Sequence, residues 1–338
     1  RGPAVSTAAA PTAGPQDAGA NRALEWFKRS LARYTIQYLL LVAVIVVFLT
    51  NENARQVNNI LSVLLQASFV GIGAAGMTIV IINRAFDLSV AGMLALCGVV
   101  LALLLPDLGI LPVVIVSLVL GGLLGSVNGL VVTKLKIPAF IATLGMMNVY
   151  LALAFIITDG QVVAVRDKAF RELGTGDILG LPIPFILMIL TYLVLHLVMT
   201  RTTYGRNIRA VGSNEIAGEV GGLRVDRVRI FAFALLGICI GLAAIVLTAY
   251  LSSANGIMAQ GYELRVIAAA VVGGTSLRGG SGTLLGTFTG ALFFTLISNA
   301  LNMYNVGAYW QYVAVGSIIV IALGLDALRR RYMSGLLT

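Results

Sequence analysis

The sequence predicts an all-α, polytopic membrane protein with about ten transmembrane helices, some of them discontinuous, and three observations support this fold class. Of the 338 residues, 59% are hydrophobic and only 11% are charged, whereas a soluble domain carries about 25% charged residues. Apolar runs follow one another along the chain, and most are long enough to cross a bilayer. Glycine is abundant, with 38 residues against 8 prolines, which favours closely packed membrane helices.

The chain divides into three parts by composition. Residues 1–30 are expected to be a disordered cytoplasmic segment, because Ala, Gly and Pro dominate there without apolar periodicity. A transmembrane domain is expected over residues 31–328, followed by a basic cytoplasmic tail over residues 329–338. The apolar runs lie at about 35–50, 60–82, 88–105, 111–133, 138–157, 183–199, 230–251, 264–276, 283–303 and 310–325.

The basic residues predict the orientation of these helices. The formal net charge is +9, but Lys and Arg gather in short segments between the apolar runs, which favours a membrane protein and not a nucleic-acid-binding one. With both termini in the cytoplasm, 18 of the 23 Lys and Arg residues lie in cytoplasmic segments, as the positive-inside rule expects. The other five are Arg55, Arg166, Lys168, Arg171 and Arg265.

Two segments interrupt the simple series of spans. Residues 82–93 contain Asp87, one of few acids next to apolar runs, and residues 271–286 are rich in glycine. Short or glycine-interrupted apolar segments are typical of discontinuous helices near a transport site, although ordinary tight turns at the membrane surface are an open alternative. We expect positive φ angles or close helix approach in the second break, at Gly273, Gly274, Gly279 and Gly280.

The spacing G-x-G-x-x-G occurs at Gly71, Gly73 and Gly76. This is the dinucleotide-binding fingerprint, but it requires a strand–turn–helix context, whereas these glycines lie within an apolar run that spans residues 60–82. Small residues in such a run let helix backbones approach closely in lipid. The three glycines are therefore expected to pack one membrane helix against its neighbours.

The sequence lacks the common motifs for catalysis and metal binding. The sequence has no phosphate-binding G-x-x-x-x-G-K-[ST] and no H-E-x-x-H. Ser281 has glycine on both sides, but the single histidine, His196, is far from it in sequence, and an intramembrane enzyme would need a paired nucleophile and base. We expect no catalytic residues, no metal and no cofactor.

Residues 200–229 form the longest polar cytoplasmic segment. It begins with a Tyr-Gly turn and contains one short helix, which Ser213 or Asn214 caps and Gly221–Gly222 ends. Such a helix is suited to docking in a groove of a partner protein, although a solvated loop helix without a partner is an alternative. The residues expected to form the docking surface are Arg209, Gly212, Asn214, Glu215, Ala217, Gly218 and Gly222.

Four blocks of the sequence resemble one family: FDLSVAGM (86–93), NGLVVTKLKIPAFIATLG (128–145), YGRNIRAVGSNEIAGEVGGLRVDRVRI (204–230) and GYELRVIAAAVVGGTSLRGGSGTLLGT (261–287). Their order and content are similar to those of bacterial ABC-type sugar import permeases, the ribose/xylose/galactoside group, in which the third block docks on the ATPase. That family usually has Pro-Glu after the loop asparagine, whereas Glu215 and Ile216 follow Asn214 here. It also has a basic residue where this chain has Glu219.

The resemblance implies a fold, a set of partners and a location. The fold would be like that of the vitamin B12 importer class, with about ten helices in two related halves. The partners would be a second permease subunit (the same chain or a close homologue), two cytoplasmic ABC ATPase domains that hydrolyse ATP, and an external sugar-binding protein. The location would be the bacterial inner membrane, surrounded by lipid.

A sugar pathway needs polar groups, because each buried unpaired hydroxyl costs several kcal/mol. Intramembrane polar residues are therefore candidates for the pathway, although interhelical hydrogen bonding would explain each of them as well. The candidates are Asn83, Asp87, Ser89, Asn128, Thr143, Asn148, Asn299 and Asn302.

Other functions remain to be weighed. An ion-coupled secondary transporter should carry a relay of membrane acids or histidines, and Asp87 is nearly the only one, with Asp326 at a membrane edge. An ABC permease for nucleosides, an autoinducer or branched-chain amino acids is a further alternative. Only the similarity of the four sequence blocks to the sugar permeases separates it from a sugar permease.

Overall fold

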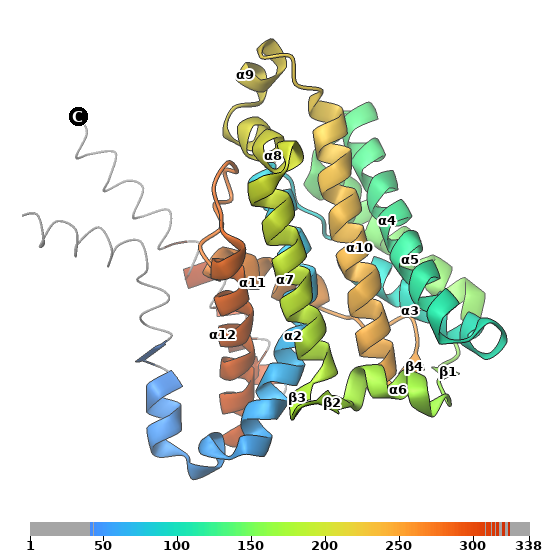
Figure 1. The fold of residues 1–338 in the computed structure, drawn as a ribbon, viewed down its shortest axis with the longest axis vertical. Helices are drawn as coiled ribbons and strands as arrows, with labels where there is room; N and C mark the ends of the chain where they lie inside the picture. The colour runs from blue at the N-terminus through green and yellow to red at the C-terminus, as the bar shows by residue number, and fades with distance from the viewer. Residues whose placement is uncertain are drawn as a thin grey trace, which may run out of the picture.

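The computed structural model describes residues 41–42, 44–307, 309–311, 313–314, 316–317, 320–321 and 324. Seven helices in this part are long and apolar enough to cross a membrane, and the helical fold agrees with the predicted class (Figure 1). These helices are α2 (Val57–Ile82), α3 (Val90–Leu108), α4 (Ile110–Lys134), α5 (Ala139–Thr158), α7 (Ile183–Arg201), α10 (Val225–Leu251) and α12 (Leu284–Met303).

The remaining elements are short. The helices are η1 (Glu52–Arg55), α6 (Lys168–Thr175), α8 (Thr203–Ser213), α9 (Glu215–Val220) and α11 (Tyr262–Val272). The strands are β1 (Val163–Ala164), β2 (Asp177–Ile178), β3 (Leu181–Pro182) and β4 (Ser253–Ala254), with β1 antiparallel to β4 and β2 antiparallel to β3. The expected run at 264–276 corresponds to α11, which has only 11 residues. The expected segments 1–30 and 329–338 lie outside the described residues, and the runs at 35–50 and 310–325 lie partly outside them.

Helix α2 is the most buried of the seven long helices, and its three glycines explain how neighbours approach it. A Cβ on Gly71 would lie 2.2 Å from Sδ of Met188 on α7, and a Cβ on Gly76 would lie 2.8 Å from the Leu236 Cα on α10. At Gly73, the Tyr262 hydroxyl of α11 would be only 2.3 Å away. The prediction of close helix packing at these glycines is confirmed.

Helices α4 and α10 form an antiparallel pair that meets mainly through backbone atoms. The contacts on α4 repeat every four residues, at Ser117, Gly121, Gly125 and Gly129. A Cβ on Gly121 would lie 2.2 Å from the Gly237 carbonyl oxygen, and one on Gly237 would lie 2.0 Å from the Gly121 carbonyl oxygen. Ser117 also donates a hydrogen bond from Oγ to the Gly241 carbonyl, at 2.9 Å. Small residues at every fourth position allow this backbone-to-backbone contact.

The two predicted breaks begin with the same helix end. After α2, Arg84 N donates to the Ile81 carbonyl and Ala85 N donates to the Val80 carbonyl; after α11, Gly274 N and Thr275 N make the equivalent pair of bonds. This is the Schellman pattern, whose C′ residue adopts a left-handed conformation. Arg84 has φ 59° and Gly274 has φ 88°. The two discontinuities in the first and second halves of the chain are therefore built alike.

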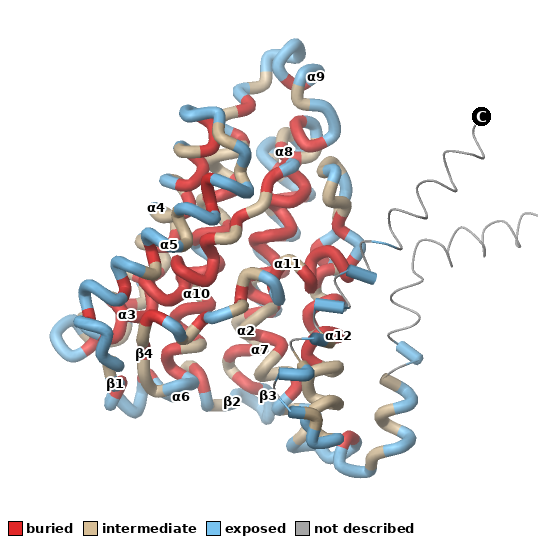
Figure 2. Tube along the Cα trace, turned by 180° about the vertical axis from the view of Figure 1, so that it is seen from behind, coloured by how far each residue is buried: buried red, intermediate tan, exposed pale blue. Residues whose placement is uncertain are grey.

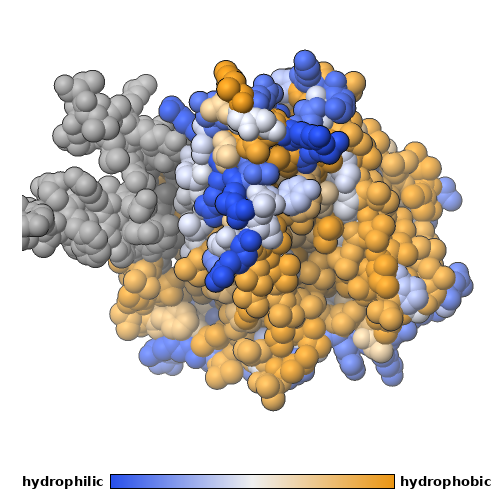
Figure 3. Space-filling view, turned by 45° about the horizontal axis from the view of Figure 1, so that its top comes forward, coloured by the Kyte–Doolittle hydropathy of each residue, from blue (hydrophilic) through white to orange (hydrophobic). Residues whose placement is uncertain are grey.

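The polar segments gather at the two ends of the molecule. Helices α8 and α9 lie at one end, and β1 to β4 with α6 lie at the other (Figure 1). Hydrophilic side chains cover the α8–α9 end above an apolar body (Figure 3). Buried positions follow α10 and its neighbours, whereas α9 is mostly exposed (Figure 2). The end with α8 and α9 is called the docking end below.

Candidate functional site

Three of the eight polar candidates, Asp87, Ser89 and Asn128, meet in one buried network at the first break, and a fourth, Thr143 on α5, binds the backbone of the same break. The Asp87 carboxylate accepts hydrogen bonds from Ser89 N (2.8 Å) and Ser89 Oγ (2.6 Å) on one oxygen, and from Asn128 Nδ2 (2.9 Å) on the other. Thr143 Oγ1 accepts from Leu88 N at 3.0 Å. All four candidates are fully buried.

Tyr150 completes this network, and sequence reasoning missed it. Its hydroxyl donates to Asn128 Oδ1 at 2.8 Å, which fixes the amide so that its Nδ2 faces Asp87. A tyrosine within an apolar run reads as packing, so no sequence signal could have found this role. Because a buried carboxylate is costly unless it is hydrogen-bonded, the network holds the break in place against α4 and α5.

Burial dominates the electrostatics of Asp87, which lies outside the spanning helices. Desolvation raises the pKa of its carboxyl, while the hydrogen bonds from Ser89 and Asn128 lower it, and the net shift is upward. Both carboxylate oxygens of Asp87 already accept hydrogen bonds from protein groups. This geometry fits the alternative in which the residue makes structural hydrogen bonds between helices instead of contacting the sugar.

The other four candidates lie elsewhere. Asn83 is fully buried, and neither its Oδ1 nor its Nδ2 has a partner among the described residues. Asn299 exchanges two amide hydrogen bonds with Asn59, at 2.8 and 3.2 Å. Asn302 Oδ1 accepts from Gln311 Nε2 at 2.6 Å, and Asn148 is exposed on α5, donating only to its own helix. The eight candidates therefore form no single cluster.

The polar segment that follows α7 contains two helices, not one. Thr202 Oγ1 accepts from Gly205 N and caps α8, so the expected Tyr-Gly turn is wrong: Tyr204 and Gly205 belong to the first turn of α8. Burial of Ile208 and Val211 stabilises this helix. Ser213 ends α8 and does not cap the next helix.

Helix α9 agrees with the predicted short helix. Asn214 Oδ1 accepts from Ala217 N at 3.1 Å, which is an N-cap, and Gly221 and Gly222 end the helix, the latter with φ 82°. A 2.9 Å ion pair between Glu215 and Arg229 joins α9 to α10. The alternative cap, Ser213, is not used.

The outer surface of α9 is apolar. Ile216 is 74% exposed and Val220 is 86% exposed, and they lie four residues apart, on one face of the helix. Ala217 beside them is exposed, while Gly218 faces inward and is buried. Sequence reasoning missed Ile216 and Val220, although their spacing within a polar segment was a usable signal.

A junction connects α8 to both helix breaks. The Gly280 N donates to the Ile82 carbonyl at 2.8 Å, and a Cβ on Gly212 would lie 1.8 Å from that same carbonyl oxygen. The predicted left-handed turn is present, since Gly279 has φ 79° and Gly280 has φ 75°. Gly273 packs against the Gly286 backbone instead. Only residues without a side chain fit at this crossing.

Arg84 lies across this junction. Its Nε donates to the Arg278 carbonyl at 2.9 Å, and its Nη2 donates to the Ser213 carbonyl at 2.5 Å. Holding a non-glycine residue in the left-handed region costs about 1 kcal/mol, and the equivalent position of the second break is a glycine. Arg84 therefore adopts a backbone conformation that is unfavourable for a residue with a side chain.

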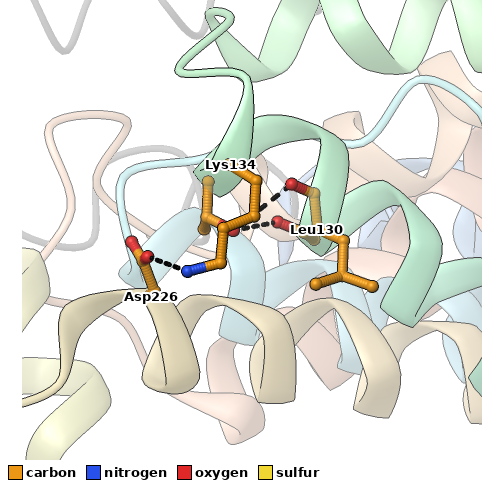
Figure 4. A network of polar contacts seen from close by, with 5 residues as sticks. Leu130, Lys134 and Asp226 are labelled. Carbon is orange, nitrogen blue, oxygen red and sulfur yellow. Dashed lines mark hydrogen bonds and ion pairs between the residues drawn. The ribbon is translucent and has the colours of Figure 1, made fainter.

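Two further features lie at the docking end. Lys134 and Asp226 point toward one another and form a 2.8 Å ion pair between α4 and α10 (Figure 4); since both are exposed, it stabilises the fold by at most about 1 kcal/mol. A cleft of about 530 Å³ opens between α7, α8 and the start of α12, and Arg209, His196 and Thr283 line it. The described residues contain no group of three or more His, Cys, Asp or Glu that could hold a metal.

Comparison with known proteins gives a consistent result. The model of a family described as "Branched-chain amino acid transport system / permease component" matches residues 59–323. The chain is 39% identical to the ribose import permease protein RbsC of Haemophilus influenzae and 38% identical to that of Bacillus subtilis, in each case over 85% of this chain and 90% of the relative. It is 36% identical to the L-arabinose transport system permease protein AraH of Escherichia coli, over 89% of this chain and 94% of the relative. No solved structure matches the chain significantly.

Proposed function

The chain belongs to the family described as the permease component of the branched-chain amino acid transport system, and from this membership we propose that it is the permease subunit of an ATP-driven importer for a monosaccharide. The family description is broad, but the similar curated proteins carry ribose and L-arabinose. They are transport components and not enzymes. The solute proposed here is therefore a sugar, and amino acids, nucleosides and autoinducers are not favoured.

The observation that carries the ATPase part of the proposal is α9. Two large apolar side chains, Ile216 and Val220, project from a capped helix at the polar end of the molecule. Burying each in a groove would contribute about 1.5–3 kcal/mol, and a short helix in a groove is a common recognition mode. The occupant we propose is the surface of an ABC ATPase subunit, which would hydrolyse the ATP.

The remaining partners follow from the same class of importer. One permease would pair with a second permease subunit, with one ATPase domain under each, and an external binding protein would deliver the sugar to the end that carries α6. The complex would lie in the bacterial inner membrane, with α9 and both termini in the cytoplasm. The sorting of basic residues supports this orientation, since Arg84 and Lys134 lie at the docking end, and Arg166 and Lys168 lie near β1 and α6 at the other end.

For the sugar pathway we propose a division among the polar candidates. Asn148, Asn299 and Asn302 are at least partly exposed and are able to offer amide groups to a hydroxyl of the sugar. The network around Asp87 instead maintains the shape of the first break. This division assigns contact with the sugar to residues whose hydrogen bonds can be exchanged at low cost.

Enlarging Ala217 to Trp tests the docking proposal in the reconstituted importer. Ala217 lies between Ile216 and Val220 on the exposed side of α9, so an indole there would keep the helix out of its groove. Sugar uptake and sugar-stimulated ATP hydrolysis should fall together, while the permease still inserts. The measurements are ATPase activity, uptake of ribose and L-arabinose, and co-purification of the ATPase.

Ala169→Trp is the matched control, because Ala169 is exposed on α6 at the opposite end. It should leave co-purification of the ATPase unchanged. Normal uptake, ATP hydrolysis and co-purification in Ala217→Trp would show that α9 is not the docking element.

A further inference from the structure

Arg84 joins three segments that are far apart in the sequence. It belongs to the first break, its guanidinium reaches the Arg278 carbonyl in the second break, and it also reaches the Ser213 carbonyl at the end of α8. The stem of its side chain lies over Gly279, where an added Cβ would come within 2.2 Å of the Arg84 Cγ. One side chain thus joins both helix breaks to the polar segment that carries α9.

The bond to α8 has a specific electrostatic basis. Ser213 is the last residue of α8, and the last carbonyls of a helix lack partners within the helix. A cation at this end also interacts favourably with the helix dipole. Because the guanidinium donates from a planar fork, it holds two carbonyls at a fixed angle, which an ammonium group cannot do.

The backbone of Arg84 adds an independent observation. The residue has φ 59° at the position where the second break has Gly274 with φ 88°. Strained residues of this kind persist where the surrounding structure holds them, and they gather at switching segments. Folding alone would be served at lower cost by glycine, as the second break demonstrates.

We infer that Arg84 is the coupling residue of this permease: it transmits movement of the α8–α9 segment to the two breaks that follow α2 and α11 together. This inference rests on the proposed function, because the movement would be driven by the ATPase that docks on α9. The backbone bond from Gly280 to Ile82 joins the two breaks to each other, and Arg84 joins that pair to α8. Gly212 and Gly280 also pack α8 against the breaks through backbone contacts, and the guanidinium adds two directional bonds that keep α8 aligned with both breaks when it moves.

The test uses the complete reconstituted importer with Arg84→Asn. Asparagine tolerates the left-handed conformation, so the helix end is retained while the guanidinium is lost. We expect normal co-purification and retained ATP hydrolysis, with sugar imported per ATP hydrolysed reduced about tenfold, because two charge-assisted hydrogen bonds are lost. Arg84→Lys, which keeps the charge but not the fork, should give an intermediate ratio.

Arg278→Gln is the matched control. It removes a positive charge from the same junction but keeps the backbone carbonyl that Arg84 contacts, so the ratio should stay at the wild-type value. A wild-type ratio in Arg84→Asn would overturn the inference. An equal loss of assembly, ATP hydrolysis and uptake would also overturn it, since Arg84 would then serve folding alone. Failure of the proposed function would look different, because the wild-type complex itself would neither import sugar nor hydrolyse ATP.

Discussion

Asp87 illustrates how one residue can be explained by its hydrogen-bond partners. Its carboxylate accepts from Ser89 and Asn128, and the Tyr150 hydroxyl fixes the orientation of the Asn128 amide. Since Asn128 already uses its oxygen for Tyr150, it can present only a donor to residue 87. The position therefore requires two acceptor oxygens, and a carboxylate is the side chain of this size that supplies them.

We predict a graded effect of substitutions at this position. Asp87→Asn places a second amide donor opposite Asn128 and loses about one hydrogen bond. Asp87→Leu removes the acceptor of Ser89 N and Ser89 Oγ and one of the acceptors of Asn128 Nδ2, at about 1–3 kcal/mol for each group left unsatisfied. Uptake and the thermal midpoint of the purified permease should fall more for Leu than for Asn.

A double variant that exchanges the side chains of residues 87 and 128 provides the control. In Asp87→Asn combined with Asn128→Asp, a donor again faces an acceptor, and Tyr150 can still donate to residue 128. The double variant should regain stability relative to Asp87→Asn. Wild-type behaviour of both single variants would contradict the role of this network.

At the scale of elements, the α4–α10 pair determines how much of the molecule can bend. The two helices touch through backbone atoms at Gly121, Gly125 and Gly237, so at these positions no flexible side chain separates them. Interiors packed this closely transmit displacement and do not absorb it. We expect α4 and α10 to move as one rigid unit during transport.

Gly125→Ala tests this contact with a single methyl group. The added Cβ would lie 2.2 Å from the Phe233 carbonyl oxygen on α10, and overpacking of this kind costs about 1–3 kcal/mol. The matched control is Gly145→Ala on α5, where nothing lies within 4 Å of the added Cβ. The thermal midpoint in detergent should fall for Gly125→Ala and stay the same or rise for Gly145→Ala; equal midpoints would contradict the predicted contact.

The sequence predicted the helices more accurately than the contacts between their side chains. Long apolar runs gave seven spans close to their observed bounds, and the caps of α9 followed from Asn214, Gly221 and Gly222. Helix α8 was missed because its stabilising burial comes from tertiary contacts, which propensity does not report. For the same reason polarity alone suggested eight pathway residues, whereas two of their partners, Tyr150 and Asn59, lie 22 and 240 positions away in sequence.

At the scale of the whole molecule, the orientation in the membrane is testable by labelling. Cysteines introduced singly at Glu219 and Lys168, which are exposed at opposite ends, should react with a membrane-impermeant reagent from the cytoplasmic side and the outer side respectively. The native Cys97 and Cys239 are buried and should not react. The opposite sidedness would contradict the orientation proposed from the basic residues.

The contact between α4 and α10 also limits how this protein can diverge. In most helix pairs a larger residue on one side can be accommodated by a smaller one on the other, so pairs of positions drift together over evolutionary time. Here the atoms opposite Gly121 and Gly237 are carbonyl oxygens, which every residue type carries. A mutation on one helix therefore has no compensating mutation on the other. In a saturation mutagenesis screen for uptake, these glycines should be intolerant individually, and no second-site suppressor should arise across the pair.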